Sequence, residues 1–215
     1  FRFLKARKKD GFLNVISIFS FIGITIGVAV LIIVMSVMNG FRTELINKII
    51  GFNAHAIVKP YDKPLIPLTD IDYFSGVVSN EGEAVIMSKV NTKGILLKGY
   101  LENDFSKLKI SNNQNYFGST KLNSNSISIG KDLSFILNID IGDHITIMST
   151  SGVQTLVGNF PRQEKFIVIS IFDSGVSEFN ENVAYINLSK LENFFDKNEK
   201  NRFNEYYFNN PRNTD

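Results

Sequence analysis

The chain has 215 residues, of which 44% are hydrophobic, and it carries 23 basic and 21 acidic residues but no cysteine. The lack of cysteine excludes a disulfide scaffold and any metal site with cysteine ligands, and the apolar fraction excludes an intrinsically disordered chain. Residues 1–10 hold five basic residues and one acidic residue, a net charge of +4, whereas the rest of the chain holds 18 basic and 20 acidic residues, a net charge of −2. The basic character therefore belongs to one short segment, and nothing beyond it favours nucleic-acid binding.

Residues 11–41 contain no charged side chain and are densely apolar. A bilayer core of about 30 Å needs about 20 apolar residues in a helix, so this run predicts a transmembrane helix. A buried helix of a soluble protein seldom runs this long without a charge. A cleaved signal peptide fits poorly, because its apolar region normally has about 7–15 residues. The one Ala-x-Ala triplet, at residues 54–56, also lies well beyond the apolar run.

The position of the basic cluster predicts the orientation of this helix. Basic residues remain on the cytoplasmic side of a membrane, so residues 1–10 are expected in the cytoplasm and residues 42–215 on the far side. The chain begins with Phe1 rather than methionine, which suggests a start inside a longer reading frame, although removal of an initiator methionine gives the same result.

The helix is expected to continue beyond the membrane to about residue 50. Phe41, Leu45 and Ile49 recur at helical spacing, and Gly51 is expected at the C′ position that ends the helix. A helix that projects this far can transmit movement between a membrane domain and a domain folded beyond it, although an ordinary stalk has the same pattern.

Gly23 and Gly27 form a GxxxG motif inside the apolar run. Small residues at this spacing allow two helices to approach closely in lipid, so these two glycines are predicted to be a helix-packing face. The span contains neither an acid nor a base, which argues against a proton or ion path along this helix alone.

Residues 42–215 predict a compact α+β domain. Apolar patterns and turn residues predict strands over 55–59, 83–90, 93–100, 127–129, 145–147, 166–172, 182–188 and 202–208. Helices are expected from a cap at Thr69 through Ile71, Phe74 and Val78, over 132–137, and over 189–197 with Ser189 as its cap. The polar stretch 103–126 is predicted to be loop and short helix. Residues 150–152 are expected to reverse the chain into a long arm, and the irregular order of elements favours two small α+β lobes.

The sequence offers little that supports catalysis. His55 and His144 lack the spacing of a metal site, and there is no phosphate-binding loop. Residues 173–175 (Asp-Ser-Gly) lack the strand–elbow–helix context of a nucleophilic serine, and Glu178 with Glu181 is interpreted as a solvated pair. We therefore predict no catalytic residue, no metal site and no enzymatic activity in this chain.

Three segments together resemble a known family. SFIGITIGVAVLIIVMSVMNGFRTELINKIIGFNAHAIV (residues 20–58) is similar to a first transmembrane helix and its exit, ISIGKDLSFILNIDIGDHITIMS (127–149) to a strand–helix–strand segment, and SIFDSGVSEFNENVAYINLSKLENFF (170–195) to a later strand–loop–strand–helix. They occur in the order found in the lipoprotein-releasing ABC-transporter permeases of the LolC/LolE family, within the MacB/FtsX-like superfamily. The chain resembles the N-terminal portion of such a permease.

The resemblance implies a permease subunit of the bacterial inner membrane that releases acylated lipoproteins to the periplasmic chaperone LolA. It implies a second permease, identical or related, and a cytoplasmic LolD-like ATPase dimer, so that ATP is used by the partner and this chain binds no cofactor. It also implies a two-lobed, MacB-like periplasmic core, with an outer lobe at about residues 51–92 and 165–215 and an inserted lobe at about 93–164.

In LolC-type members of the family, a protruding arm before the late strand grips LolA. The matching stretch here is residues 152–164. The resemblance implies chaperone-binding roles for Gly152, Val153, Gln154, Pro161, Arg162 and Gln163. An ordinary β-hairpin is the alternative, so a chaperone-recruiting type, a lipoprotein-binding type and a merged form all stay open.

Two other functions remain open. One keeps the superfamily and makes the chain a MacB/FtsX-like permease that transmits mechanical force for efflux or for control of a cell-wall hydrolase. The other is a periplasmic sensor domain on a single membrane anchor.

Overall fold

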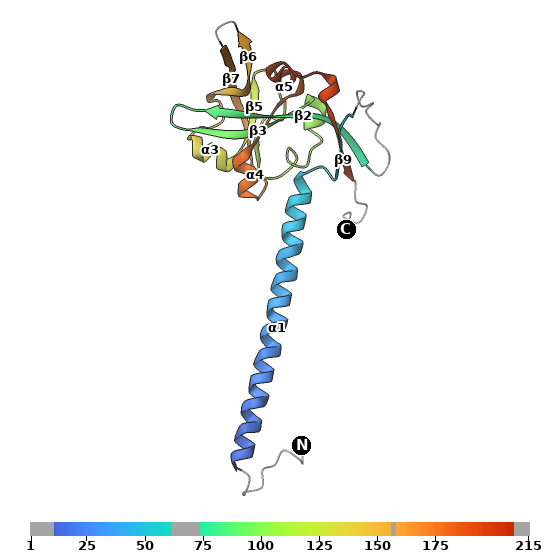
Figure 1. Cartoon of the computed structure of the whole chain (residues 1–215), viewed down its shortest axis with the longest axis vertical. Coiled ribbons are helices and arrows are strands. Elements are labelled where there is room, and N and C mark those ends of the chain that lie inside the picture. The colour runs from blue at the N-terminus through green and yellow to red at the C-terminus, as the bar shows by residue number, and fades with distance from the viewer. Residues whose placement is uncertain (1–10, 62–73, 156–157, 209–215) are drawn as a thin grey trace. The chain divides into compact units, whose positions relative to one another are not determined.

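The computed structural model describes residues 11–61, 74–155 and 158–208. The chain divides into two compact units between Asn47 and Lys48. Figure 1 shows that the first is a long helix and that the second is a domain built mainly of strands.

Helix α1 (Gly11–Phe52) is one continuous helix of 42 residues. Its candidate membrane-spanning part, Val15–Glu44, is strongly apolar, and none of its most apolar window is buried within the structure. A helix that is apolar all round and is not covered by protein is typical of a membrane span. The helix predicted over residues 11–41, with its extension to about residue 50, is confirmed. The expectation that Gly51 ends it was wrong, because α1 includes this residue.

The domain contains short helices between its strands. Its helices are α2 (Glu102–Phe105), α3 (Lys131–Leu137), α4 (Ser177–Asn182), α5 (Leu188–Phe195) and the 3-10 helix η1 (Glu199–Asn201). Its strands are β1 (Ala56–Val58), β2 (Phe74–Met87), β3 (Thr92–Tyr100), β4 (Tyr116–Gly118), β5 (Ser126–Gly130), β6 (His144–Thr155), β7 (Gly158–Phe172), β8 (Val183–Asn187) and β9 (Phe203–Phe208). The predicted α+β class is confirmed.

Six of these strands close into a barrel. Within the described part of the chain the strands form one sheet in the order β1-β9-β2-β3-β8-β5-β7-β4, and β6 pairs with both β2 and β7. The pairing β2-β3-β8-β5-β7-β6 therefore returns to β2. The pairs β3–β8 and β5–β7 are parallel, and the other pairs are antiparallel. Closure leaves no free edge along these six strands where they pair around the ring.

The main hydrophobic core fills this barrel. Each barrel strand contributes two buried residues, two positions apart, as the alternation of side chains across a strand requires. These pairs are Ala84 and Ile86, Ile95 and Leu97, Ile127 and Ile129, Ile145 and Ile147, Phe166 and Val168, and Ala184 and Ile186. Leu133 and Leu137 of α3 and Leu191 and Phe194 of α5 complete the cluster. The two helices thus pack their apolar faces against the barrel interior.

A second core cluster, which includes Tyr100, surrounds a buried carboxylate. Glu205 accepts hydrogen bonds from the hydroxyls of Ser79 at 2.8 Å, Tyr100 at 2.8 Å and Tyr207 at 2.9 Å, and its carboxylate lies 3.8 Å from the Lys98 ammonium. Burial, reinforced by the neighbouring Tyr207 and Glu205, raises the pKa of Tyr100, so this phenol stays protonated and donates. The charge is buried together with enough donors to replace water.

The local patterns predicted most of the elements. The hairpin of β2 and β3, the unit β5–α3–β6 and the pair β8–α5 are confirmed. The stretch 103–126 contains β4, which was not predicted. Glu178, for which a loop was expected, lies in α4.

The predicted helix that begins at Thr69 was wrong in its described part. Phe74 and Val78 lie in β2, paired with Phe208 and Asn204 of β9; Thr69 and Ile71 lie outside the described residues. Their spacing of four suits a helix, but pairing with a distant strand decides the conformation.

Two further expectations were wrong. Asn187, not Ser189, caps α5, because the Asn187 side chain accepts a hydrogen bond from the Ser189 N–H at 3.0 Å. Residues 150–152 do not reverse the chain, because β6 continues to Thr155.

The expected lobe boundaries both fall inside strands. The boundary at residues 92/93 lies in β3, and the boundary at 164/165 lies in β7. Residues 48–215 group as one compact unit. Strand pairing therefore lends these boundaries no support, and the two-lobe division stays a prediction.

Candidate functional site

Strands β6 and β7 extend beyond the barrel as a two-stranded arm. β2 pairs with β6 only over Thr146–Ser149, after which β6 pairs with β7 alone. We define the arm as residues 150–155 and 158–162, and the arm base as residues 161–165 of β7, where the arm joins the barrel. In Figure 1 these ends of β6 and β7 project past the other strands of the domain. The predicted arm is thus a β-hairpin that lacks a third strand.

A bulge separates the arm from the barrel. Met148 pairs with Gln163 and Gly152 pairs with Pro161, so three residues of β6 lie opposite a single residue of β7. Extra residues on one strand bend it and increase its twist, so the bulge changes the direction of the arm relative to the barrel. A proline, which lacks an N–H to donate, is tolerated at such a position.

The strand register brings the predicted arm residues together in pairs. Gly152 lies opposite Pro161, Val153 opposite Phe160, and Gln154 opposite Asn159. The side chains of Val153 and Gln154 lie outside the described residues.

Two polar contacts attach the base of the arm to α5. The guanidinium of Arg162 donates a hydrogen bond to the backbone carbonyl of Asn193, and the carboxylate of Glu164 forms an ion pair with Lys190. Arg162 and Glu164 lie on the same face of β7, two residues apart, and the next residue on that face, Phe166, is in the barrel core. Since α5 packs against that core, these contacts hold the arm base to a fixed element.

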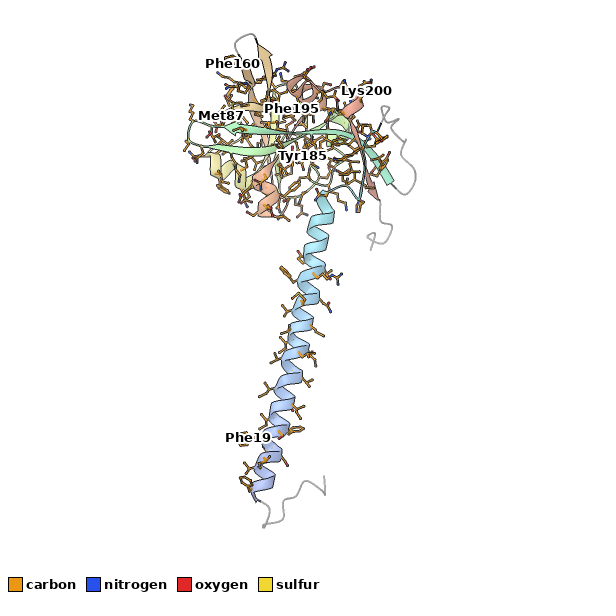
Figure 2. All side chains as sticks on the ribbon, viewed as in Figure 1. Phe19, Met87, Phe160, Tyr185, Phe195 and Lys200 are labelled. Atoms are coloured by element: carbon orange, nitrogen blue, oxygen red, sulfur yellow. The ribbon has the colours of Figure 1, made fainter. Side chains whose placement is uncertain are left out.

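The opposite face of the arm base is exposed. Pro161, Gln163 and Lys165 all point away from the core, and the Gln163 amide lies 3.6 Å from the sulfur of Met148. Phe160, labelled in Figure 2, is 57% exposed although it lies on the inward face, because the arm extends past the core there. The arm base therefore exposes an amide and an ammonium group, and the arm exposes an aromatic ring.

Residues 17–209 of the sequence match the family model of the MacB-like periplasmic core domain. The chain belongs to this family. The match covers α1 from residue 17 and all described residues of the second unit. We call this unit, residues 48–215, the MacB-like domain.

Individual proteins are also similar to the chain. The chain is 28% identical over 202 residues to the lipoprotein-releasing system transmembrane protein LolC of Xylella fastidiosa, which covers 89% of this chain and 49% of the relative. It is 28% identical over 196 residues to LolC of Neisseria meningitidis serogroup B, covering 85% and 47%. The periplasmic region of MacB from Actinobacillus actinomycetemcomitans aligns at 12% identity with a TM-score of 0.48, covering 76% and 78%. The chain spans about half the length of the curated relatives it matches.

Sequence reasoning gave Arg162 and Gln163 the same role, but in the structure their side chains lie on opposite faces of β7. Arg162 contacts α5, whereas Gln163 faces outward. The same alternation identifies Lys165 as an exposed neighbour that sequence reasoning missed. Sequence reasoning also missed Phe160, which lies on the inward face and is exposed because the arm extends past the core. The signal that could have found Lys165 is the period of two along β7, but reading it requires knowing that the strand begins before Pro161.

Gly23 and Gly27 lie one turn apart on α1. A Cβ atom added to either would meet no atom of this chain within 4 Å, so neither glycine is required by a contact inside the described chain. Their assignment as a helix-packing face stays a prediction.

The remaining polar candidates of the MacB-like domain build turns. The described residues contain no group of three or more His, Asp or Glu residues that could hold a metal ion. The Ser174 hydroxyl donates to the Val176 carbonyl at 3.2 Å and bonds Asn180 at 2.7 Å, while Gly175 has a φ of +73°, so residues 173–175 form a turn rather than a nucleophile site.

Two acidic side chains near this turn, Asp173 and Glu181, each form an ion pair with a lysine. Partial burial opposes ionisation of Asp173, but hydrogen bonds from the Gly175 N–H, the Asn180 amide and the Lys131 ammonium prevail and lower its pKa. A hydrogen bond of 2.7 Å from Lys93 lowers the pKa of Glu181. Both carboxylates are held in their ionised form, which does not suit a general acid at neutral pH.

Proposed function

We propose that this chain is part of the permease subunit of an ABC transporter that releases acylated lipoproteins from the bacterial inner membrane. The observation that carries the proposal is the similarity to LolC over 89% of the chain. That share exceeds the MacB-like domain alone, so the similarity includes part of α1. The family match by itself suits a MacB/FtsX-like force-transmitting permease equally, and LolC similarity favours lipoprotein release.

The proposed topology follows from charge and hydropathy. The basic residues 1–10 would remain in the cytoplasm, α1 would cross the inner membrane, and the MacB-like domain would fold in the periplasm. A helix of 42 residues is about 63 Å long, roughly twice the hydrocarbon thickness. A continuous helix of this length would carry movement from the membrane to the periplasm.

The proposed work requires energy from a partner. Each buried acyl CH₂ group contributes about 0.8 kcal/mol, so one long chain is retained by roughly 10 kcal/mol and a triacylated protein does not leave the membrane unaided. No phosphate-binding loop occurs in the sequence. We therefore assign ATP hydrolysis to a separate cytoplasmic ATPase dimer, and to this chain a non-catalytic role beside a second permease subunit.

We also propose that the arm is the contact for the periplasmic chaperone LolA. Its support is geometric, because the arm leaves the barrel, and Pro161, Gln163 and Lys165 are exposed on one face of its base. A surface with these groups and no structural duty suits recognition by another protein.

Reconstitution of the full-length protein tests this function. The permease, its ATPase and a triacylated lipoprotein are placed in proteoliposomes, and soluble lipoprotein bound to LolA is measured after ATP is added. We expect release that requires ATP, LolA and the acyl chains, with a non-acylated form of the same protein as the control. Retention of the lipoprotein under all conditions, with intact ATPase activity, would favour a force-transmitting permease instead.

A further inference from the structure

A pocket opens at the end of β7 that lies farthest along the strand from the arm. It has a volume of about 480 Å³ and is lined by residues of β4, α3, the turn before β6 and the end of β7. Three large apolar side chains at this pocket are unusually exposed: Phe117 at 59%, Phe135 at 71% and Ile141 at 44%. Exposed apolar clusters of this kind on a folded domain mark binding surfaces.

This apolar pocket borders a second, smaller one. The second has a volume of about 340 Å³, and both are lined by Asn138, Ile139 and Asp143. The carboxylate of Asp143 accepts a hydrogen bond from the Asp140 N–H at 2.8 Å, which holds the turn between them in place. The wall that the two pockets share therefore includes an ordered turn.

A third pocket continues the path to the arm. It has a volume of about 480 Å³ and shares Ser88, Lys89 and His144 with the second pocket. Its far side is lined by Gln163 and Lys165, which belong to the exposed face of the arm base. Each pocket thus shares lining residues with the next, and we call the three adjoining pockets together the groove.

The chemistry of this groove changes along its length. At the apolar end, the only lysine lining the first pocket, Lys131, is paired with Asp173 at 3.2 Å. At the arm end, Lys89 and Lys165 line the third pocket, and neither forms an ion pair with a described residue. An apolar recess joined to a cationic, hydrogen-bonding end matches an amphiphile lying along the groove.

We propose that this groove binds one acyl chain of a lipoprotein, with the chain in the apolar pocket and the polar peptide end against Lys89 and Lys165. The identity of the ligand rests on the proposed function. A pocket of about 480 Å³ falls in the size range of small-molecule sites, about 300–1,000 Å³, and a single chain fits it better than a folded partner does. The groove would present the lipoprotein at the base of the arm, where the chaperone is proposed to bind.

Photo-cross-linking in the full-length protein tests this placement. A photoreactive amino acid replaces Phe135 at the apolar end, Lys165 at the arm end, or Lys200 as an exposed control outside the groove (Figure 2). The protein is held in nanodiscs, a triacylated lipopeptide is added, and mass spectrometry identifies which part of the lipopeptide is joined. We expect acyl attachment at position 135, peptide attachment at position 165 and only background at position 200.

Other patterns would overturn the proposal. Equal attachment at all three positions would show non-specific contact. Attachment of position 135 only to nanodisc phospholipid would assign the apolar cluster to the membrane surface, and attachment to a second copy of the chain would assign it to a protein interface.

A matched pair of variants tests the apolar end of the groove without a photoreactive residue at position 135. Phe135→Glu is compared with Tyr61→Glu, since both rings are exposed but only Phe135 lines the groove. With the photoreactive residue at position 165, the first variant should lower lipopeptide attachment at least about tenfold, and the second should leave it unchanged. Equal attachment in both variants would contradict the groove. Because the assay needs neither ATP nor chaperone, the groove and the release function can fail separately.

Discussion

The same two strands, β6 and β7, pass through two different environments. In the barrel they are flanked by other strands and covered by helices, and Phe166 is fully buried. In the arm, six residues away on the same face of β7, Phe160 is 57% exposed. The chemical pattern of the strand is alike in both places, so burial is decided by neighbouring elements. Phe160 thus lies beyond the elements that bury Phe166.

Truncation of these two rings should give the largest difference in stability between a change in the barrel and a change in the arm. Phe166→Ala removes a fully buried ring and should lower the free energy of unfolding by about 3–5 kcal/mol. Phe160→Ala, the same change on the arm, should cost less than about 0.5 kcal/mol. Denaturant titration of the full-length protein, followed by tyrosine near-ultraviolet circular dichroism, measures both. Similar losses for the two variants would show that the arm is part of the core.

The buried carboxylate should produce the next largest effect. Glu205→Leu leaves the hydroxyls of Ser79, Tyr100 and Tyr207 without their acceptor, and should lower the free energy of unfolding by about 2–4 kcal/mol. Glu199→Leu is the control, because the Glu199 side chain is exposed and its 3.3 Å ion pair with Arg202 lies at the surface. A loss for Glu205→Leu no larger than that of the control would mean that the network does not stabilise the domain.

The contacts at the arm base should matter less for stability and more for mobility. Glu164→Gln weakens the ion pair with Lys190 and should cost less than about 1 kcal/mol. Hydrogen exchange of the backbone amides in residues 152–155 should nevertheless become faster, because the arm has no third strand to hold it. Unchanged exchange would show that the hairpin is rigid without α5, and Lys107→Gln, which removes a surface ion pair with Asp104, serves as the comparison.

Replacement of the two helix glycines should have the smallest effect on the stability of the domain. Leucine at Gly23 and Gly27 meets nothing within this chain, so the free energy of unfolding of the domain should not change. Copurification of the second permease subunit should fall if these glycines form the packing face. Val30→Leu provides a conservative control on the same helix. Undiminished copurification would remove the two glycines from the interface.

Local sequence patterns predicted individual strands and helices but not the closure of the barrel. The alternation at Ile127 and Ile129, or at Ile145 and Ile147, is a property of a few adjacent residues and predicts strands directly. The pairing of β2 with β6 joins residues about 60 positions apart, for which the sequence carries no local signal. Pairing between residues far apart in the sequence also explains why Phe74 and Val78 lie in a strand rather than in the expected helix.

The candidate site divides in the same way. Similarity to a family placed the arm at residues 152–164, whereas the opposite roles of Arg162 and Gln163 depend on the strand register. The groove gathers Ser88, His144 and Lys165 from separate elements, so only the folded chain shows it.

Transfer of a lipoprotein to LolA by a Gln163→Asp variant tests the central claim, that the arm and its base serve binding while the barrel core serves the fold. The full-length permease with its ATPase is assayed in proteoliposomes, and the free energy of unfolding of the same preparation is measured. We predict transfer that is slower by at least about fivefold with unchanged stability, because the change puts a negative charge on an exposed side chain of the proposed contact surface and leaves the core intact. Transfer at the wild-type rate, or a loss of transfer that follows a loss of stability, would contradict the claim.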